Sequence, residues 1–396
     1  MDLTVQPGKL SGSVEVIPSK SQAHRLLICA AFAEGETNLV CRETNRDIEA
    51  TVQCLSALGA EIHHTQWGYH IRSAKQIPDT ALLNCHESGS TLRFMLPVAA
   101  ALGVDATFLM EGRLPARPLS PLWEEMERMG CALSRPTTDT VRCTGRLRPG
   151  RYRIDGSVSS QFITGLLLAI PLLEGQSSLE ITGKIESRPY IDLTRQAIAL
   201  FGADPDRPRA AGYVSPGTVQ VEGDWSNGAF WLAAQALGST LTTKNLSQTS
   251  AQGDRAASAL LPRLRQENIT VSAADIPDLV PILAVTAAAS HGAVFTEIQR
   301  LRLKESDRVT STVAMIRALG GKADATEDTL TVWGTGLTGG CVNSFNDHRI
   351  AMSAAIAATV CTQPVTISGA NCVEKSYPRF WEEYKHLGGQ YEQHLR

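Results

Sequence analysis

Short polar clusters rich in serine, lysine and arginine stand in front of long apolar segments of this sequence. At a helix start, such a cluster combines backbone N–H groups without a helical partner, the positive end of the helix dipole and cationic side chains, which together bind anions. The glycine at position 89 allows a ligand to approach the backbone closely. The clusters are 18–25, 87–93, 157–161, 275–278 and 346–349, with further ones at 117–118, 187–190, 304–308 and 375–379.

Each cluster also has a simpler explanation. Serine and aspartate at a helix start are ordinary caps, and proline there is a good helix starter. Arg308 could pair with Asp307 or Glu305 on an exposed turn, where the pair would contribute little. The cations nevertheless recur beside apolar helices, where a buried cation is costly unless it faces a cleft. We therefore expect small, multiply anionic ligands. The recurring cations are Lys20, Arg25, Arg93, Arg117, Lys304, Arg308, Arg349 and Lys375.

Motifs for nucleotide cofactors and metals are absent from the sequence. No G-x-x-x-x-G-K-[ST] or G-x-G-x-x-G follows a strand-like segment, so a nucleotide cofactor has no support. There is no H-E-x-x-H, and His63, His64 and His70 are isolated residues typical of strands or surfaces. We expect no cofactor and no metal.

The clusters are positioned by a repeated pattern of two helices. Apolar helices start about 66 to 70 residues apart, except for one interval of about 52. They are apolar on nearly every side, which predicts burial. A second, amphipathic helix follows each and ends in a Gly or Asn turn suited to a left-handed cap. The apolar helices start near Ser21, Ser90, Ser160, Ser226, Asp278 and Asp347, and the turns are 58–60, 129–131, 201–203, 267–268, 319–321 and 387–389.

Alternating segments after the turns predict strands and hairpins, as at 61–64 with 69–72, and at 329–333. The unit is therefore approximately βαβαββ. Six units divide naturally into two groups of three, and the short interval predicts that the fourth unit is trimmed. A junction is expected around 221–223, after a Pro/Gly-rich stretch that contains Pro205 and Pro208.

Length and composition agree with a two-domain α/β protein. A chain of 396 residues exceeds the roughly 250–300 residues at which one hydrophobic core stops growing. The net charge of −3 argues against binding nucleic acid. Nine cysteines without a C-x-x-C pair favour buried thiols in a reducing compartment. Neither a signal peptide nor an apolar run of membrane-spanning length is apparent, so we expect a cytoplasmic protein without a membrane partner, by default a monomer.

Taken in order, these clusters resemble the 5-enolpyruvylshikimate-3-phosphate synthase family, and the resemblance spans nearly the whole chain. Lys-Glu-Ser-Asp-Arg at 304–308 and Asn-Asp-His-Arg at 346–349 are its most specific motifs. The other matching residues are Pro18-Ser-Lys-Ser-x-x-x-Arg25, Glu87-Ser-Gly-Ser-Thr-x-Arg93, Arg117-Pro118, Ser157-x-Ser-Ser-Gln161 and Ser187-x-Pro-Tyr190.

The resemblance implies a fold and an activity. It implies two inside-out α/β domains, each of three βαβαββ units with buried helices and outer sheets. The first domain is 19–221, and the second is 1–18 plus 222–396, with a hinge near 18–19 and 221–222. The implied activity is transfer of the enolpyruvyl group of phosphoenolpyruvate (PEP) to the 5-hydroxyl of shikimate 3-phosphate, through a tetrahedral intermediate that loses phosphate. Both substrates are small anions, as the clusters predict independently.

The resemblance also assigns roles to residues. Asp278 is implied as the base and Glu305 as the acid, with Lys20, Lys304 and His348 also catalytic. Shikimate 3-phosphate is implied to bind Lys20, Ser21, Arg25, Ser159, Ser160, Gln161, Ser187, Tyr190, Asp278 and Lys304. PEP is implied to bind Lys20, Gly89, Arg93, Arg117, Gln161, Arg308, Arg349 and Lys375. Paired N–H groups of arginine match phosphate and carboxylate oxygens.

Related families and inactive homologues are the alternatives. UDP-N-acetylglucosamine enolpyruvyl transferases share the fold and donor, but their loop before the second unit's outer helix carries a reactive Cys or Asp. The corresponding stretch here, 111–117, is short and lacks cysteine. RNA 3′-phosphate cyclases would need nucleotide binding and a nucleophilic His. An inactive anion-binding homologue or a ring scaffold would need no matched acid and base. The sequence departs from the family pattern at two places. Glu87 and Ser88 stand where many family members have Asn-Ala, and Arg300 stands where some members have an Asn that contacts shikimate 3-phosphate. These differences affect the expected substrate contacts and the expected sensitivity to glyphosate.

Overall fold

The computed structural model describes residues 1–204 and 212–394. The chain divides into two compact units, which we call the N unit (Pro18–Glu222) and the C unit (Met1–Ile17 with Gly223–Arg396). Pro205 and Pro208, in the stretch expected before the domain junction, lie outside the described residues.

The core of the N unit is built around three buried helices: α1 (Lys20–Ala31), α3 (Gly89–Leu102) and α5 (Ser160–Ala169). Their starts lie within one residue of the predicted positions. Serine caps each start, because Ser19, Ser88 and Ser159 accept a hydrogen bond from a backbone N–H of the first turn. The polar clusters at 18–25, 87–93 and 157–161 therefore lie at the N-termini of buried helices.

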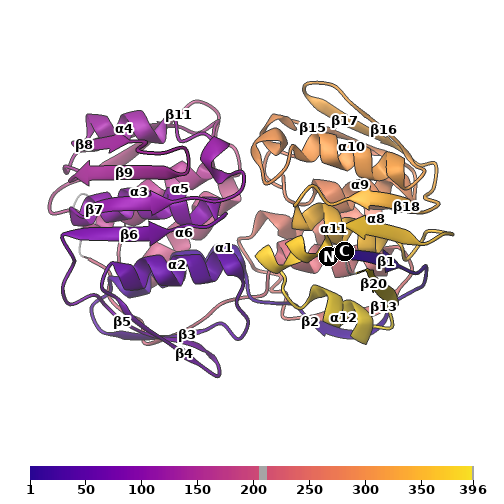
Figure 1. Ribbon diagram of the computed structural model, residues 1–396, viewed down its shortest axis with the longest axis horizontal. Helices are drawn as coiled ribbons and strands as arrows, with labels where there is room; N and C mark the ends of the chain where they lie inside the picture. Colours follow the sequence, from indigo (N-terminus) through magenta and orange to yellow (C-terminus); the bar gives the residue numbers. More distant parts are fainter. Residues whose placement is uncertain (205–211, 395–396) are drawn as a thin grey trace. The chain divides into compact units, whose positions relative to one another are not determined.

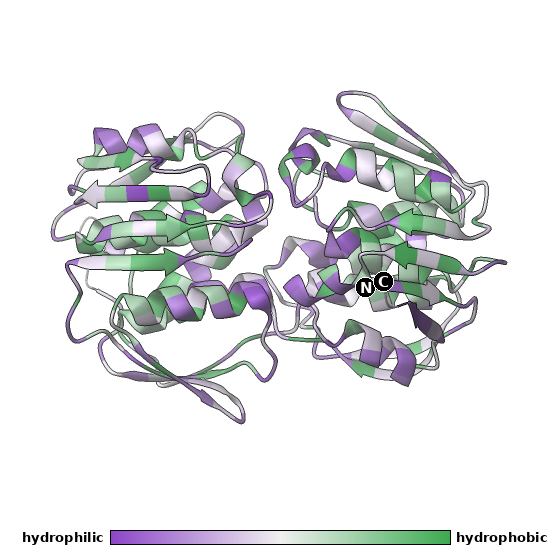
Figure 2. Ribbon diagram, in the orientation of Figure 1, coloured by the Kyte–Doolittle hydropathy of each residue, from purple (hydrophilic) through white to green (hydrophobic). Residues whose placement is uncertain are grey.

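The outer helices of the N unit are α2 (Arg46–Ala57), α4 (Leu122–Arg128) and α6 (Arg188–Leu200). Each ends before a glycine with positive φ, namely Gly59, Gly130 and Gly202, so the left-handed stops predicted from the sequence are confirmed. In α4 the exposed residues Glu124, Glu127 and Arg128 are charged, and the ribbon of this helix is partly purple in Figure 2.

The strands of the N unit form three sheets. One has the order β12 (Thr218–Gln220), β3 (Glu36–Val40), β5 (Gly68–Arg72), β4 (Glu61–Thr65). Another has the order β6 (Thr80–Asn84), β7 (Asp105–Leu109), β9 (Thr140–Gly145), β8 (Cys131–Ser134). The third pairs β10 (Arg151–Asp155) with β11 (Ser178–Thr182) in parallel. Because β12 pairs in parallel with β3, the end of this unit supplies the first strand of its first repeat.

The C unit repeats the plan with buried helices α7 (Trp225–Ala236), α9 (Val280–Ala288) and α11 (His348–Ala357). Its outer helices are α8 (Ala257–Leu264), α10 (Arg308–Ala318) and α12 (Phe380–His386). Gly320 and Gly388 are left-handed after α10 and α12, as predicted. The expected left-handed stop at Asn268 is wrong. The cap of α8, Arg265, is right-handed, and residues 265–268 pass directly into β14 (Ile269–Ser272).

Strands from both ends of the chain complete the C unit. β1 (Asp2–Val5) lies antiparallel between β19 (Val365–Ser368) and β20 (Tyr391–His394), and β18 (Gly340–Asn343) pairs with β19 (Figure 1). β2 (Ser11–Glu15) pairs in parallel with β13 (Thr240–Lys244). The fifth repeat forms the sheet β14-β15-β17-β16, with β15 (Ala293–Thr296), β16 (Lys322–Ala325) and β17 (Thr329–Trp333). No hairpin separates α8 from β14, which confirms that the fourth repeat is trimmed.

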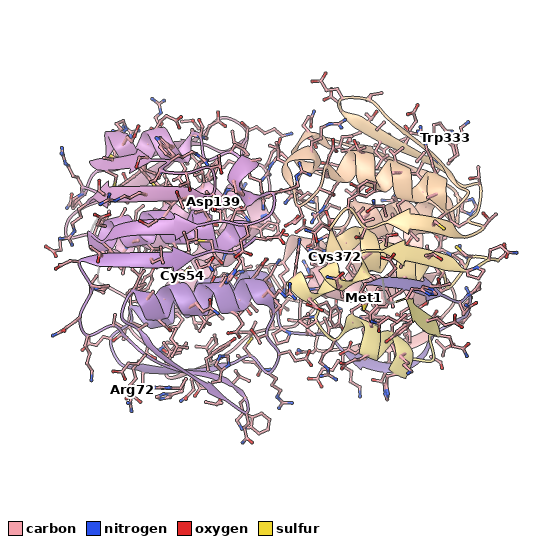
Figure 3. All side chains as sticks on the ribbon, viewed as in Figure 1. Met1, Cys54, Arg72, Asp139, Trp333 and Cys372 are labelled. Carbon is pink, nitrogen blue, oxygen red and sulfur yellow. The ribbon has the colours of Figure 1, made fainter. Side chains whose placement is uncertain are left out.

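All nine cysteines lie within the described residues as free thiols, and all except Cys341 are buried. Figure 3 labels two of them, Cys54 and Cys372. Within the described ranges, no helix has the length and apolar character needed to cross a membrane. In that same part of the chain, no cluster of three or more His, Cys, Asp or Glu side chains is arranged to hold a metal ion.

Candidate functional site

In the N unit, buried Arg25 links the start of α1 to α5 and α6. Its guanidinium donates to Thr194 Oγ1 at 2.8 Å, Thr164 Oγ1 at 3.1 Å and the carbonyl oxygens of Ser21 at 2.6 Å and Tyr190 at 3.0 Å. Burial lowers the pKa of Arg25 to about 10, so the group remains a cation at neutral pH. Arg25 therefore fixes the first turn of α1 against α5 and α6.

Gly89, the first residue of α3, lies beneath two guanidinium groups. A Cβ at this position would come within 2.5 Å of Arg117 Nη1 and 2.7 Å of Arg93 Nη1. Arg93 Nη1 also donates to Gln161 Oε1 at 2.8 Å, and Gln161 Nε2 donates to Ser90 Oγ at 3.0 Å. Two cations, a helix N-terminus and an amide thus meet at Gly89, which is buried and lacks the Cβ that would displace the two guanidinium groups.

Lys20, the first residue of α1, pairs with a carboxylate that the sequence did not single out. Its Nζ lies 3.0 Å from Asp47 Oδ2 in α2, and both side chains are mostly buried. Ser187 begins α6 with a left-handed backbone (φ 55°), an uncommon conformation for serine that often marks a functional position. Ser159 and Ser160 stand at the start of α5.

In the C unit, buried Arg308 is the centre of a carboxylate cluster. The guanidinium donates to Asp347 Oδ2 at 2.8 Å, Asp278 Oδ1 at 2.5 Å and Glu305 Oε2 at 2.5 Å. Ser306 Oγ also donates to Asp347 Oδ2 at 2.9 Å, and Asp347 caps α11 by accepting from Arg349 N at 3.0 Å. The alternative of an exposed Arg308 pair is therefore wrong, since this side chain is 1 % exposed.

Three cations surround Asp278. Besides Arg308, Lys304 Nζ lies 3.6 Å from its Oδ1 and Arg349 Nη2 lies 3.5 Å from its Oδ2. Burial opposes ionisation of this carboxyl, but Arg349, Lys304 and Arg308 outweigh burial and hold its pKa well below the usual range. Burial also lowers the pKa of Lys304 to about 8, against the attraction of Asp278. Asp278 is thus an ionised carboxylate in a strongly cationic setting.

The remaining motif residues of the C unit lie on neighbouring turns. His348 and Arg349 form the buried start of α11. Lys375, at the end of the 3₁₀ segment η5 (Ala370–Lys375), donates to the carbonyl of Asn346 at 3.0 Å. The contact links the motif at 346–349 to the one at 375–379.

A second buried carboxyl, Asp254, accepts a hydrogen bond from Ser226 Oγ near the start of α7. Burial, followed by the negative charge of Asp278, raises its pKa to about 7, although Arg349 and Ser226 act in the opposite direction. Asp254 therefore titrates near neutral pH, while Asp278 stays ionised.

This pair predicts a particular dependence of stability on pH. Because the folded pKa of Asp254 lies above its unfolded value, the folded state holds the proton more tightly between about pH 4 and pH 7, and stability falls as pH rises through that range. Asp254→Asn removes the charge and should raise the free energy of unfolding near pH 8, by as much as about 4 kcal/mol, and change it little near pH 5.

Urea unfolding of both proteins at the two pH values measures this difference. An equal change at both pH values would contradict the assignment. Asp278 and Asp347 affect stability in a different pH range. Their pKa values are lowered in the folded state, so the stability that they add is lost only as pH falls below about 4.

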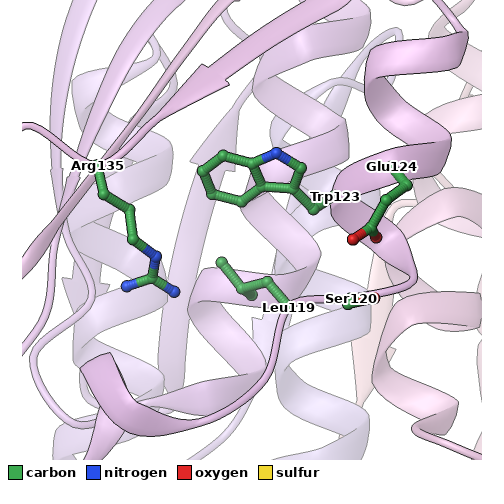
Figure 4. A pocket seen from close by; sticks show the side chains of 5 residues that line it. All are labelled: Leu119, Ser120, Trp123, Glu124 and Arg135. Carbon is green, nitrogen blue, oxygen red and sulfur yellow. The ribbon is translucent and has the colours of Figure 1, made fainter.

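A surface depression elsewhere in the N unit is separate from these residues. It has a volume of about 430 Å³ and is lined by Leu119, Ser120, Trp123, Glu124 and Arg135 (Figure 4). Arg135 lies over the indole of Trp123 at 5.9 Å, and Ser120, Glu124 and Arg135 are exposed. None of the predicted site residues lines this depression, so it is not the candidate site.

A family model described as EPSP synthase (3-phosphoshikimate 1-carboxyvinyltransferase) matches residues 5–384 of the chain. The chain belongs to the EPSP synthase family. A 3-phosphoshikimate 1-carboxyvinyltransferase of Clostridium kluyveri is 38% identical over 98% of this chain and 97% of the relative, and one of Clostridium novyi is 35% identical over 98% of each. The fold matches a solved structure of EPSP synthase from Acinetobacter baumannii with a TM-score of 0.81, at 23% identity, over 99% of this chain and 100% of that chain.

Within this EPSP synthase family member, several of the predicted residues contact one another. In the N unit, Arg93, Arg117 and Gln161 lie around the start of α3, while Lys20 pairs with Asp47 and Arg25 binds residues of α1, α5 and α6. In the C unit, one set lies around the buried Arg308 guanidinium and comprises Asp278, Lys304, Glu305 and Arg349. Sequence reasoning missed Asp47, Asp254 and Asp347 as partners. Asp347 stood inside a quoted motif, whereas Asp47 and Asp254 carried no signal beyond being acidic residues near helix starts. Glu87, one of the departures from the family pattern, lies against Gly112, where a Cβ would come within 2.5 Å of its Oε2.

Proposed function

We propose that this chain transfers the enolpyruvyl group of PEP to the 5-hydroxyl of shikimate 3-phosphate and releases phosphate, a step in the biosynthesis of aromatic amino acids. The observation that carries the proposal is the group of motif cations beside an ionised carboxylate in the C unit. Cations suit two anionic substrates, and a carboxylate among them suits proton transfer. The names of the relatives describe the same reaction.

We assign shikimate 3-phosphate to residues of the N unit. The hydroxyl, amide and ammonium groups assigned to this substrate lie at or near helix starts. They belong to Lys20, Ser21, Ser159, Ser160, Gln161, Ser187 and Tyr190. Arg25 contributes charge and also holds the first turn of α1 in place through its four hydrogen bonds. A phosphate binds well at such a site because helix N–H groups and cations act together.

We assign PEP to the cations that surround Gly89 in the N unit and Asp278 in the C unit. Arg93 and Arg117 flank Gly89 at the start of α3, and paired guanidinium N–H groups at a helix N-terminus suit a carboxylate or phosphate oxygen. Arg308, Arg349 and Lys375 supply positive charge in the C unit. Lys20 and Gln161 are the remaining residues that we assign to PEP.

Asp278 is assigned as the base for the 5-hydroxyl of shikimate 3-phosphate. Its pKa lies well below the usual range because Arg349, Lys304 and Arg308 outweigh its burial, which alone would raise the pKa. A carboxylate held so firmly is a weak base. We infer that an anionic substrate drawing Lys304 or Arg349 away from Asp278 raises the basicity of this carboxylate, so substrate binding itself prepares the base.

Glu305 is assigned as the acid that protonates the methylene carbon of PEP. Arg308 donates to its Oε2 at 2.5 Å, which favours the ionised form. Bound phosphate and carboxylate groups offset that cation and favour the protonated form. Lys304, with a pKa lowered to about 8, exchanges protons readily near neutral pH and supports the 5-hydroxyl. His348 begins α11 beside Arg349 and is assigned a supporting role.

Mass spectrometry of the reaction in D₂O tests this chemistry. Protonation of the methylene carbon makes a transient methyl group, so the enolpyruvyl ether formed from shikimate 3-phosphate should carry deuterium in its methylene group, with one phosphate released per ether. An ether without deuterium would rule out the addition and elimination route. We also propose that the enzyme is a cytoplasmic monomer, in keeping with its free thiols.

A further inference from the structure

A continuous chain of buried side-chain hydrogen bonds crosses the N unit from α1 to the start of α3. His24 Nδ1 lies 2.7 Å from Thr51 Oγ1, Thr51 Oγ1 lies 2.8 Å from Thr91 Oγ1, and Thr91 Oγ1 lies 2.7 Å from Ser88 Oγ. All four residues are at most 1 % exposed. The chain therefore joins three helices through direct contacts between buried side chains.

The hydroxyl hydrogens fix the direction of this chain. Each threonine hydroxyl has one hydrogen to donate. Ser88 Oγ, the cap of α3, accepts from Thr91 N at 3.2 Å and from Thr91 Oγ1, whose other acceptor, the carbonyl of Asp47, is more distant at 3.4 Å. Thr51 must then donate to Thr91, and it accepts from His24 Nδ1.

The other ring nitrogen of His24 supports the same direction. Nε2 is buried and has no hydrogen-bond partner among the described residues. If every bond in the chain were reversed, Nε2 would carry a buried N–H without an acceptor, which is unfavourable. Burial, followed by the charges of Lys20 and Arg25, holds the pKa of His24 well below its ordinary value, so the ring is neutral.

We propose that His24 is a positioning residue for the anion site: its neutral Nδ1–H tautomer orders Thr51, Thr91 and Ser88, and thereby sets the first turn of α3 against α1 and α2. Thr91 Oγ1 also lies 3.4 Å from the carbonyl oxygen of Asp47, so these hydrogen-bonded side chains lie next to the Lys20–Asp47 pair. The spacing matters, because a single added Cβ at Gly89 would already displace the guanidinium groups of Arg93 and Arg117. A small displacement of α3 therefore disturbs the donors assigned to PEP.

Thr51→Val tests the proposal by removing the central hydroxyl and keeping the shape of the side chain. Since the proposal rests on the proposed function, we expect the KM for PEP to rise about tenfold, with kcat within about twofold of the native value. Thr51→Ser keeps the hydroxyl and should restore the KM. The matched control is Thr286→Val in α9, because that buried hydroxyl donates only to the carbonyl of Ile282 in its own helix. Its KM should match that of the native protein.

Nitrogen-15 NMR of the histidine rings tests the tautomer without any turnover, and the native protein suffices. The His24 signal, assigned by its loss in His24→Asn, should show a protonated Nδ1 and an unprotonated Nε2, and it should shift in Thr51→Val and return in Thr51→Ser. An Nε2–H tautomer, or a Thr51→Val protein with an unchanged KM for PEP, would overturn the proposal. An inactive native protein that shows the Nδ1–H tautomer would instead refute the proposed function. The direction of the hydrogen bonds from His24 to Ser88 would still be supported.

Discussion

Asp278→Asn should lower kcat by about 10²- to 10⁴-fold while shikimate 3-phosphate still binds. The substitution keeps the shape of the side chain and removes the negative charge that Lys304, Arg308 and Arg349 all approach. An amide cannot accept the proton of the 5-hydroxyl, so the loss should fall on the chemical step. Steady-state rates together with calorimetric titration of shikimate 3-phosphate separate the two effects.

Asp275→Asn is the matched control for this prediction. Asp275 is exposed and stands on the same connection before α9. Its substitution changes the net charge by the same amount, and we expect nearly native rates. If Asp278→Asn also kept nearly native turnover, Asp278 would not be the base.

Arg308→Lys should cost both activity and stability. A lysine keeps the positive charge, but it lacks the planar guanidinium group whose N–H donors bind Asp278, Glu305 and Asp347 at the same time. Leaving a buried group without its hydrogen-bond partner typically costs about 1–3 kcal/mol, and Arg308, which bridges three carboxylates, is 1 % exposed. We expect a loss of this size in the free energy of unfolding of the C unit, measured by urea denaturation and tryptophan fluorescence.

Arg317→Lys in the same helix serves as the control, since Arg317 and its partner Asp324 are largely exposed at 3.3 Å. This change should alter stability by no more than about 0.5 kcal/mol. A similar small effect for Arg308→Lys would show that the buried network contributes little.

The local features of the fold were predictable because each depends on a few neighbouring residues. Serine and aspartate caps, continuous apolar faces and glycine turns defined the buried helices and most helix ends. Asn268 was the exception. Asparagine permits a left-handed conformation but does not require it, and residues 265–268 connect α8 to β14 without one.

The contacts between distant segments were not predictable in the same way. The pairing of β1 with β19 and β20 joins residues near opposite ends of the chain, and periodicity contains no information about such partners. The side chains that contact the site residues were not predictable for the same reason, because they too lie far apart in the sequence. Nothing in the sequence ties Lys20 to Asp47, or shows that Arg25 makes four hydrogen bonds to protein acceptors. The raised pKa of Asp254 depends on burial and on Asp278, which lies on another loop.

The most direct test of the account is phosphate release from PEP by the native enzyme, with shikimate 3-phosphate and UDP-N-acetylglucosamine supplied as separate acceptors. The account predicts release with shikimate 3-phosphate alone, and the same release should be lost in Asp278→Asn. Release with UDP-N-acetylglucosamine would show that the acceptor is misassigned while the donor site stands. Release with neither acceptor would contradict catalysis and leave an anion-binding protein of the same fold.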